Sequence, residues 1–589
     1  MPKALFSTLQ VAYFKPNQRA CSCQSKLKVF KTYKKKMVTF EIGPFYAHIT
    51  EMQCEKCQAI YSSEELYKIA PKVSKFGYDV LVFIGKAIFL DCLSEKDIQN
   101  KLRKKNIPIS IREIGYLGKK FIIYLALAHK ESKENINQLM ALNGGYILHL
   151  DATCETDSPQ LMSALDSISN IVIDNMKLAS ENSDQIIPFL KQIKKDYGSP
   201  IATVHDMGRG ILKAVKTVFP SVNDYICHYH FLRDIGKDLL SSEYTHLMKA
   251  LRKNSVRPKL RKRLKILTEE IDKDTNLKKS LDLYIQQKME GSVSNDISTS
   301  VSVYFWIHWI LNSKKELSGY GFPFDRYHYV FYQRLMSVKE AIETLPVKLQ
   351  KDSNVLQLNT ILVSILNDQD LKEQVTILTE KIKIFDQLRE AMQIALPNGK
   401  NGLNDDGKNV DVKTIKEKVT AFRNSKEVEE AANKNNDYKK MLKQIDKYWE
   451  KLFADPLTVF NSKGKKIIIQ PQRTNNILER LFRSIKRGFR KKSGNKSLNR
   501  TFKSLISNTP LIENLKISEY MKILLGGHNS LEDRFADINV KDVRKELKKI
   551  NNVEEISSKK IKKILLSPNL PLKIAKATKK SWANKKKSN

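Results

Sequence analysis

Three acidic residues of this chain stand where they could act on a phosphodiester. Asp151 and Asp206 each end a short apolar run, and Glu479 begins a helical stretch followed by many basic residues. Strand ends open at the edge of a sheet, so two aspartates there can share one cleft. Carboxylates are the ligands that hard cations such as Mg²⁺ and Mn²⁺ prefer. Two such ions can activate the attacking oxygen and steady the leaving oxygen of an in-line displacement.

The segment after Thr474 has the pattern of an amphipathic helix. One apolar stripe with steps of 4, 3 and 4 residues consists of Leu478, Phe482, Ile485 and Phe489. Basic residues cover much of the remaining surface, namely Arg480, Arg483, Lys486, Arg487 and Arg490. Glu479 lies at the margin of the stripe in the first turn, where the helix dipole favours its ionised form. The alternative role for Glu479 is a first-turn glutamate paired with Arg483 at i+4.

The net charge of the chain indicates a polyanionic partner. Lys and Arg number 103 against 64 Asp and Glu, a formal charge of +39 that is spread along all 589 residues. This distribution favours a protein that lies along nucleic acid, most simply DNA. A genome whose codon usage favours Lys is the alternative explanation. The hydrophobic fraction of 41% argues against global disorder, and the length suggests about three to five domains.

No part of the sequence has the pattern of a membrane segment or a secretory signal. The start lacks an extended apolar core, and the runs Val80–Leu90 and Phe121–Ala128 are too short to span a bilayer. The seven cysteines are an odd number, which favours metal ligands over disulfides. We therefore expect a cytoplasmic, nucleoid-associated protein with no membrane partner.

Four of the seven cysteines bracket a strand-like segment near the N-terminus. The pair Cys54 and Cys57 has the usual two intervening residues of a zinc knuckle, whereas Cys21 and Cys23 are separated by one residue. Two such pairs around short strands predict a zinc-ribbon-like unit with a structural Zn²⁺. The unusual first pair leaves open whether Cys21 or Cys23 is a ligand, and four reduced cysteines in a small β unit are the alternative.

The next segment has the pattern of a helix-turn-helix unit. A buried helix over 80–90 is followed by a capping box at Ser94, a turn over 106–110 and a third helix over 110–128. In a DNA-binding unit of this kind Ser110, Arg112 and Glu113 would face the groove. A three-helix packing unit that does not bind DNA has the same periodicity.

Alternating strands and helices begin at residue 143. Three strands, a helix, a strand, a helix, a strand and a helix are the order of an α/β RNase H-like core, which an all-α insertion would interrupt. We predict a zinc-ribbon-like unit at 1–62, a helix-turn-helix unit at 63–140, the first part of the core at 141–245, a helical insertion at 246–465, the last part of the core at 466–530 and a partly disordered basic tail at 531–589. A linker-like stretch over 397–407 divides the insertion.

The order of these motifs resembles a known family. Asp151, Asp206, Cys227-His-Tyr-His230 and Asn475-Asn-Ile-Leu-Glu479 are similar to the DDE transposases of bacterial insertion sequences, in the Mutator-like branch that carries a Cys-x-x-His signature. The resemblance covers roughly 145–245 and 470–510. It implies that Asp151, Asp206 and Glu479 hold two Mg²⁺ or Mn²⁺ ions, and that Cys227 and His230 are structural.

Other residues near these motifs offer rival assignments. Cys227 and His230 could form a nucleophile–base pair, but the strand phase of Cys227 points it into the core. Glu155 and Asp157 are rival acids just after Asp151, and His205 is expected on the side of its strand opposite to Asp206. The aromatic pair in the insertion, Trp306 and Trp309, is expected in core packing rather than in base stacking.

These features together predict a transposase. It would bind terminal inverted repeats, cut the DNA strand with water and join the freed 3′-OH to target DNA. Arg480, Arg483, Lys486, Arg487 and Arg490 would contact phosphates without base specificity, and Arg112 would belong to the base-reading unit. The resemblance also implies a homo-oligomer that holds two DNA ends. The alternatives are a transposase-derived DNA-binding protein without cleavage activity and an RNase H-like nuclease without strand transfer.

Overall fold

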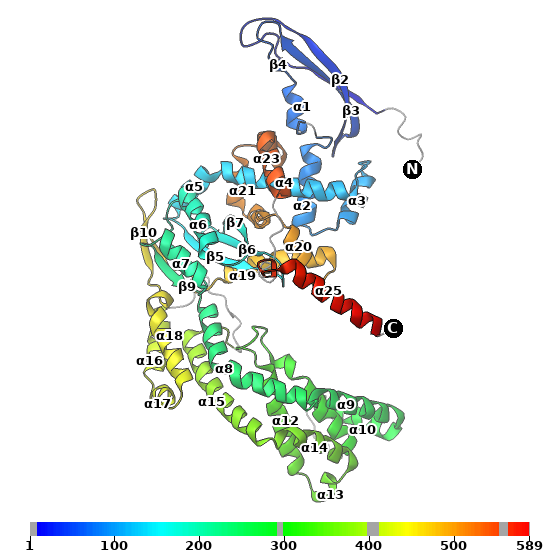
Figure 1. The fold of residues 1–589 in the computed structure, drawn as a ribbon, viewed down its shortest axis with the longest axis vertical. Helices are drawn as coiled ribbons and strands as arrows, with labels where there is room; N and C mark the ends of the chain where they lie inside the picture. The colour runs from blue at the N-terminus through cyan, green and yellow to red at the C-terminus, as the bar shows by residue number, and fades with distance from the viewer. Residues whose placement is uncertain (1–8, 73, 291–297, 397–411, 553–563, 588–589) are drawn as a thin grey trace. The chain divides into compact units, whose positions relative to one another are not determined.

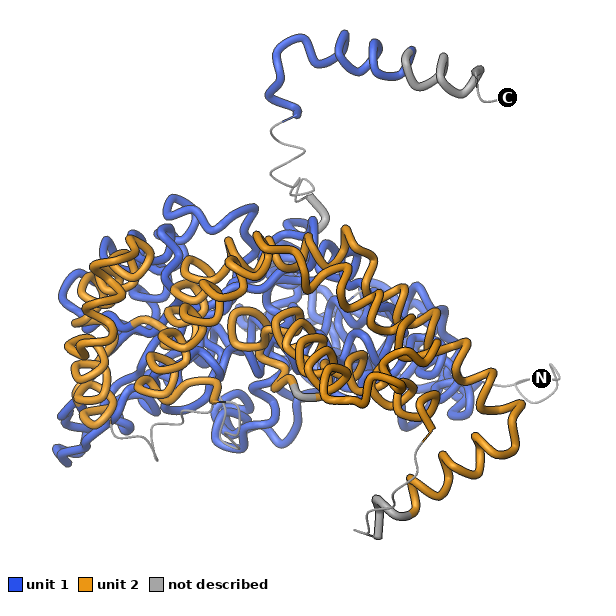
Figure 2. The backbone as a smooth tube through the Cα atoms, turned by 90° about the horizontal axis from the view of Figure 1, so that it is seen from below, with its two compact units in different colours: residues 1–225, 456–589 blue, residues 226–455 orange. Residues whose placement is uncertain are grey.

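The computed structural model describes residues 9–72, 74–290, 298–396, 412–552 and 564–587. The chain forms two compact units, one made of residues 1–225 and 456–589 and the other of residues 226–455 (Figure 2). The first unit therefore contains both ends of the sequence, and the second is a single continuous segment. Within the described residues, no helix is long and apolar enough to cross a membrane.

The first unit begins with a small sheet. Its strands are β1 (Val11–Phe14), β2 (Leu27–Thr39), β3 (Gly43–Cys54) and β4 (Ile60–Tyr61), in the order β1-β3-β2 with β4 paired to β3. The long β2–β3 hairpin turns at Gly43, whose φ of +78° lies in the left-handed region that glycine adopts without strain. The short helix α1 (Glu64–Ile69) contributes Leu66 to the small core that includes Phe14, Met37 and Phe45.

Four helices follow this sheet: α2 (Tyr78–Phe89), α3 (Glu95–Lys104), α4 (Ile111–Glu131) and α5 (Lys133–Leu142). The hydroxyl oxygens of Ser94 and Ser110 accept hydrogen bonds from backbone N–H groups in the first turns of α3 and α4, so both helices begin at a side-chain cap. Gly85 lets α2 approach α4, because a Cβ there would lie 2.1 Å from the ring of Phe121. The three helices expected from the sequence are therefore present in the expected order.

The second sheet of this unit has five strands: β5 (Ile147–Thr153), β6 (Gln160–Asp166), β7 (Val172–Leu178), β8 (Ala202–His205) and β9 (Asn223–Ile226). Their order is β7-β6-β5-β8-β9. Figure 1 labels β5, β6, β7 and β9 of this sheet. β6 is antiparallel to both β5 and β7, and β8 is parallel to β5. The strands β5, β7 and β8 therefore point the same way, and their carboxyl ends lie at one edge of the sheet.

Helices α6 (Ser183–Tyr197) and α7 (Arg209–Val218) pack with the side chains of Leu148 and Leu150 in the large core. Side chains on the other side of the sheet meet the C-terminal part of the unit, because alternate residues of a strand point to opposite faces. There Leu161 packs against Phe502 of α20 (Asn499–Ser504), and His149 contacts the start of α19 (Asn476–Ser493). The helix-period stripe predicted after Thr474 is thus part of a real helix.

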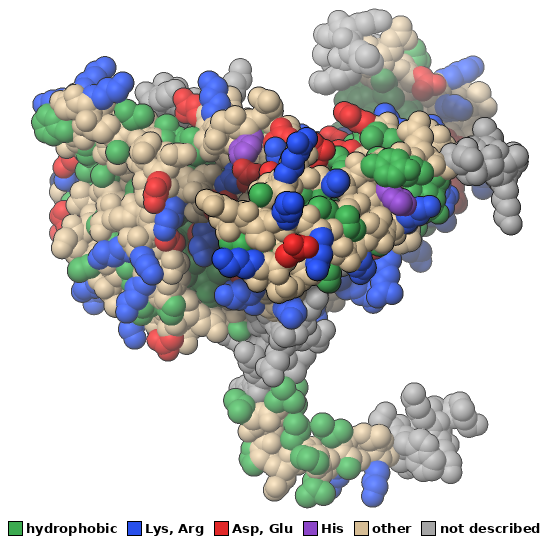
Figure 3. All heavy atoms as spheres, turned by 90° about the horizontal axis from the view of Figure 1, so that it is seen from above, with side chains coloured by type: hydrophobic (Ala, Val, Ile, Leu, Met, Phe, Trp, Pro, Cys, Tyr) green, Lys and Arg blue, Asp and Glu red, His purple; other side chains and the backbone are tan. Residues whose placement is uncertain are grey.

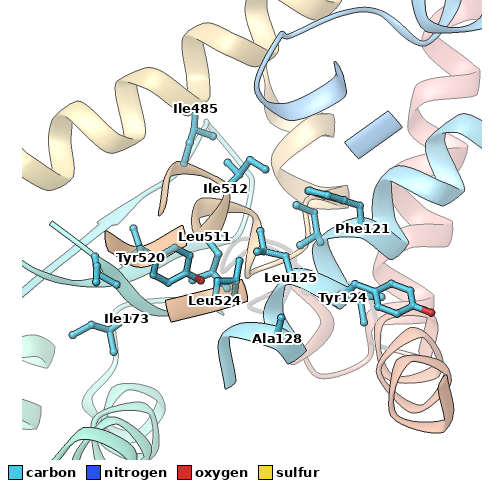
Figure 4. Packing of buried hydrophobic residues seen from close by; sticks show 14 of the residues in the cluster. Phe121, Tyr124, Leu125, Ala128, Ile173, Ile485, Leu511, Ile512, Tyr520 and Leu524 are labelled. Atoms are coloured by element: carbon cyan, nitrogen blue, oxygen red, sulfur yellow. The ribbon is translucent and has the colours of Figure 1, made fainter. Parts of the chain in front are cut away.

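Residues beyond α20 complete this core. The 3-10 helix η3 (Thr509–Lys516) and helix α21 (Ser518–Leu525) place Leu511, Ile512, Tyr520 and Leu524 against α4, as Figure 4 shows. His129 of α4 fixes this contact, since its Nδ1 lies 2.8 Å from the Tyr520 hydroxyl and its Nε2 lies 2.8 Å from the Ile173 carbonyl oxygen. The buried side chain of His129 on α4 therefore connects this helix to both β7 and α21.

The segment expected to be a partly disordered tail contains three described helices: α22 (Leu531–Ala536), α23 (Val540–Asn552) and α25 (Leu570–Lys587). Phe535 of α22 stacks on Tyr124 of α4, with ring centroids 5.3 Å apart, so the first part of this segment belongs to the core. The expected disorder also concerns residues 553–563, 588 and 589, which lie outside the described residues.

The second unit is an array of helices. They are α8 (His228–Lys253), α9 (Val256–Lys273), α10 (Thr275–Glu290), α11 (Thr299–Leu311), η2 (Ser313–Glu316), α12 (Tyr327–Glu343), α13 (Val347–Gln350), α14 (Ser353–Leu366), α15 (Gln369–Met392), α16 (Val412–Arg423), α17 (Lys426–Lys434) and α18 (Asn436–Leu452). A buried ion pair joins three of them, because Lys381 of α15 contacts Glu243 of α8 at 2.9 Å and Asp437 of α18 at 2.8 Å. The linker-like stretch over 397–407 was expected to divide this helical region, and it lies outside the described residues.

A two-stranded hairpin, β10 (Leu457–Phe460) and β11 (Lys466–Ile469), returns the chain to the first unit. Its backbone contacts the end of α5, where the Ser462 N–H donates to the Ala141 carbonyl. The excess of Lys and Arg is spread over the visible surface rather than gathered in one patch (Figure 3). Because Lys and Arg are spread over this face, their number alone does not identify a binding site for a polyanion. The shape of the surface and the ion pairs of its basic residues are more informative.

Candidate acidic site and cysteine cluster

The parallel pairing of β5 and β8 brings Asp151 and Asp206 to the same edge of the sheet. The last paired residues of the two strands are Leu150 and His205. If this register is continued by one residue, Asp206 follows β8 directly opposite Asp151 on β5. The two aspartates singled out in the sequence therefore share one face at the carboxyl ends of neighbouring strands.

Asp151 is buried among other acids. Its side chain is only 7% exposed. Burial raises the pKa of Asp151 well above its usual range, and the negative charges of Asp206, Glu479 and Glu181 raise it further. The Ala152 N–H, which donates to the Asp151 carboxylate at 2.8 Å, opposes this rise only in part. The structure thus brings together all three predicted acids, and it adds a fourth.

Asn475 fixes Glu479 relative to β5. The fully buried Asn475 side chain donates through Nδ2 to the Leu150 carbonyl at 2.8 Å, and its Oδ1 lies 2.9 Å from Nδ1 of His149. Burial lowers the pKa of His149 to about 4, so this ring is neutral and its Nδ1–H donates to the amide oxygen. The Glu479 N–H donates to the Asn475 carbonyl at 3.0 Å. Glu479 therefore lies one helical turn beyond a side chain that is bonded to the Asp151 strand.

The hydrogen bonds of Asn475 were not predicted from the sequence, where this residue stood only in a helix start and in the motif of the resemblance. Among the described residues, no salt bridge joins an acid to Arg483, the residue considered as a partner of Glu479. The Arg483 side chain lines a cavity along α19.

Glu181 is the acid that sequence reasoning missed. It lies between β7 and α6, just past the carboxyl end of a strand that is parallel to β5. A Cβ built on Gly208 would lie 3.0 Å from Oδ1 of Asp206 and 3.4 Å from Oε2 of Glu181, so both carboxylates border this glycine. Gly210 admits the Glu181 backbone, since a Cβ there would be 2.1 Å from its carbonyl oxygen. The strand-end rule did not find Glu181, because this residue lies three positions after the end of β7.

His205 is fully buried and contacts the backbone of Asp206 and the side chain of Asp224. Its Nδ1 lies 2.6 Å from the Asp206 carbonyl oxygen, and its Nε2 lies 2.6 Å from Oδ1 of Asp224. Thr203, two residues earlier on the same side of β8, donates to the same carboxylate at 3.1 Å. The imidazole thus ties the Asp206 turn to β9.

Glu155, considered as a rival acid, has basic partners. Its carboxylate lies 3.5 Å from Nζ of Lys486 and 3.1 Å from a guanidinium nitrogen of Arg490. Lys486 also donates to the Cys154 carbonyl at 3.2 Å. Lys486 and Arg490, which were both predicted to contact phosphates, hold the loop after β5 in this structure, and their contact with DNA stays a prediction. Asp157 in the same loop is exposed.

Cys227 and His230 lie where β9 passes into α8. The last predicted strand of the first part of the core ends at Ile226, Cys227 follows it and α8 begins at His228. Cys227 is the N-terminal cap residue of α8 and is 1% exposed, and His230 in the first turn is also buried. Both residues are core residues of this junction in the described structure.

The four N-terminal cysteines form one cluster that could hold a metal ion. Their sulfur atoms all lie within 4.8 Å of one another, and the Cys21–Cys57 and Cys23–Cys54 distances are 3.3 and 3.4 Å. A tetrahedral site with Zn–S bonds of about 2.3 Å separates its sulfurs by about 3.8 Å, so the donor set and spacing fit zinc. Both members of the unusual pair, Cys21 and Cys23, take part.

Hydrogen-bond donors favour the thiolate form of two of these cysteines. The Cys23 N–H and the Tyr61 hydroxyl lower the pKa of Cys21 to about 5. The N–H groups of Cys57 and Lys56 likewise lower the pKa of Cys54. Hydrogen bonds with other cysteines of the cluster raise the pKa values of Cys23 and Cys57, and a bound cation would offset this rise.

In comparisons with known proteins, no family model matches the chain and no curated protein matches it. The site is therefore interpreted from its own chemistry. Three carboxylates follow or end parallel strands at one edge of a sheet, and a fourth comes from a helix that is hydrogen-bonded to the central strand. A second, separate cluster offers four sulfurs.

Proposed function

We propose that this protein is a DNA transposase of the DDE type, which cuts DNA and joins the freed 3′-OH to target DNA. The order β7-β6-β5-β8-β9, with the first three strands antiparallel and β8 parallel to β5, is the order expected of an RNase H-like core and supports this proposal. The helical second unit enters between β9 and the Glu479 helix, as the resemblance implies.

The observation that carries the proposal is the convergence of Asp206, Glu479 and Glu181 on the buried Asp151. Burying several carboxylates together is unfavourable unless a cation neutralises them, and oxygen donors suit Mg²⁺ and Mn²⁺. The residues present therefore fit divalent cations. Asp151 and Asp206 would hold both ions, and Glu479 would complete the second.

Each neighbouring residue has a defined part in this proposal. Bound divalent cations would supply charge neutralisation and a more reactive attacking oxygen. Asn475 keeps Glu479 directed at the Asp151 strand, and His205 keeps the Asp206 turn against β9. Burial of Asp151 excludes bulk water from one side of the reacting phosphate, which strengthens every charge interaction there.

The cysteine cluster serves stability in this proposal. The sheet of β1–β4 has a core of few apolar residues, and a unit of that size gains much of its folding free energy from a structural metal. We assign Zn²⁺ to Cys21, Cys23, Cys54 and Cys57. Transposition also requires two DNA ends to be held together, so the active form is a homo-oligomer on DNA.

The test is cleavage of the DNA that flanks the gene of this protein, with Mg²⁺ or Mn²⁺ added. Asp206→Asn should abolish cleavage and joining, whereas the matched change Asp157→Asn, in an exposed acid of the loop after β5, should leave both unchanged. Wild-type binding without cleavage would overturn the enzyme and leave a DNA-binding protein. Cleavage without joined product would leave an RNase H-like nuclease, and equal loss in both variants would assign the site elsewhere.

A further inference from the structure

Two neighbouring cavities of the first unit lie along α19. The first has a volume of about 570 Å³ and the second about 620 Å³. Ile88 and Phe89 at the end of α2, Phe489 of α19 and Thr509 of η3 line both, and the rings of Phe89 and Phe489 meet edge to face between them. We call the two cavities together the α19 groove. It lies between the helices α2–α4 on one side and α19, α20 and η3 on the other.

One stripe of α19 supplies the cations of the first half of the groove. Arg480, Arg483, Arg487 and Lys491 line it, and all four are exposed. Their spacing of 3, 4 and 4 residues places them along one face of the helix. Lys486 and Arg490, which hold Glu155, follow an adjacent stripe that also contains Glu479. At about 100° per residue Arg483 lies within about 40° of Glu479, so the cationic stripe borders the acidic site along the helix.

The second half of the groove receives cations from the helices of the predicted helix-turn-helix unit. Arg112 and Lys119 of α4 face it together with Arg500 of α20. Arg112 was expected to read DNA bases as part of an independent unit, but here it lines the same groove as α19. Tyr116, which is 41% exposed, adds an aromatic surface between them.

Acids of the groove neutralise only a minority of these cations. Lys492 contacts Glu95 at 2.7 Å, and Lys516 contacts Glu513 at 2.6 Å. No described acid forms a salt bridge with Arg480, Arg483, Arg487, Lys491, Arg112, Lys119 or Arg500. Such a concentration of unneutralised charge in a concave surface attracts an anion.

The length of the stripe selects the class of anion. From Arg480 to Lys491 the helix rises about 16 Å, at 1.5 Å per residue. One strand of B-DNA presents about five phosphates over this length. The guanidinium group of arginine can also donate two parallel hydrogen bonds to the oxygens of one phosphate. A single small anion would contact only one turn of this stripe, whereas a phosphodiester chain can contact every turn.

We propose that the α19 groove binds the sugar–phosphate backbone of the DNA substrate and leads it to the acidic site. This inference rests on the proposed function, because the groove begins at Arg480, the residue directly after Glu479. The arginines of one stripe position the backbone, and α4 acts with α19 in this contact. An acidic protein segment is the competing occupant.

The test measures binding of the full-length protein to a generic 30-base-pair duplex, by fluorescence anisotropy between 50 and 200 mM salt. The groove variant is Arg483→Gln/Arg487→Gln. The matched control is Lys191→Gln/Lys195→Gln, which removes the same charge from two exposed positions on α6. A second control, Lys439→Gln/Lys443→Gln, removes two cations four residues apart from exposed positions on α18.

The groove variant should lower the salt slope of log K by about 2 and weaken binding roughly 50-fold at 0.1 M salt, since each phosphate contact contributes a slope of about 0.9. Both controls should retain the wild-type slope. Arg483→Lys/Arg487→Lys should recover most of the slope, which shows that the groove variant failed through charge rather than through misfolding. Equal losses in the Lys191→Gln/Lys195→Gln control, or competition by polyglutamate as effective as that by DNA, would overturn the inference.

These results are independent of the cleavage test. If the groove variant binds like wild type while Asp206→Asn abolishes cleavage, the groove inference fails and the transposase proposal stands. If the groove variant loses binding while Asp206→Asn still cuts, the groove inference stands and the assigned acidic site fails.

Discussion

The cysteine cluster and the acidic site of this molecule differ in how their ionisable groups are held. The cysteine cluster gathers four sulfurs within 4.8 Å, and backbone N–H groups lower the pKa of two of its thiols. At the acidic site, burial and the charges of three other acids raise the pKa of Asp151. The first is arranged for stability around one ion. In the acidic site the carboxylates near Asp151 repel one another, and a bound cation would reduce this repulsion. Ionisable groups with strongly shifted pKa values are typical of functional sites.

The largest expected effect concerns the cysteine cluster and its contribution to stability. Cys54→Ser should reduce the zinc content from one ion per chain to none and unfold the sheet of β1–β4, because a core of this size depends on its metal. The measurements are metal analysis and hydrogen exchange of residues 11–61. Cleavage-site variants such as Asp206→Asn should keep the full zinc content, and a Cys54→Ser protein with normal zinc would separate the cluster from the metal.

The second effect tests the repulsion between Asp151 and the other acids of the acidic site. Asp151→Asn should lower cleavage by at least about 10²-fold, a loss that outer-shell partners of a metal already reach. It should also raise the melting temperature without divalent cations, by about 2–4 °C for each kcal/mol of repulsion removed. A lower melting temperature in calorimetry would contradict this repulsion.

The pH dependence of the same variant has a defined sign. The raised pKa of Asp151 means that the folded chain holds its proton more tightly than the unfolded chain. Wild-type stability should therefore fall as pH rises from the usual aspartate range through the raised pKa. The stability difference between Asp151→Asn and wild type should grow over this window, and a constant difference in chemical denaturation would argue against it.

The third effect concerns the connection between the acidic site and its helix. Asn475→Ala removes two buried hydrogen-bond partners, so it should cost about 1–3 kcal/mol in unfolding free energy. It should also reduce cleavage about 10–100-fold, as expected for a residue that orients a ligand. Asn476→Ala is the neighbouring control. A stability loss with unchanged kcat would make Asn475 structural only.

The smallest effect concerns Glu181. Glu181→Gln should raise the Mg²⁺ concentration needed for half-maximal cleavage by about tenfold, since it removes one of the charges near Asp151. The exposed Glu134→Gln on α5 is the control. An unchanged Mg²⁺ titration would exclude Glu181 from the site and restore the set of three acids.

Local patterns in the sequence were sufficient for much of this arrangement. The serine cap of α3, the succession of strands and helices along the chain from β5 to α8, and the gathering of cysteines near the N-terminus follow from spacing and residue type. Asp151 and Asp206 could be paired because strand ends are recognisable from short apolar runs. These features depend on residues that are close in sequence.

The errors arose where distant residues interact. The bond between His149 and Asn475 spans 326 positions, and no local pattern predicts it. The ion pairs of Lys486 and Arg490 with Glu155 likewise join residues that are far apart in the sequence. Glu181 was missed because it lies three residues after the end of β7, in a loop that no local pattern marks.

The distance between Asp206 and Glu479 has a consequence for synthesis of the protein. At about 5–20 residues per second, roughly 14–55 s pass between translation of the two aspartates and translation of Glu479, which lies 273 residues after Asp206. During this interval β5 and β8 are present without the helix that Asn475 fastens to them. A nascent chain should therefore be unable to cut DNA until nearly all of it has been made, which gives a timed delay between expression and activity.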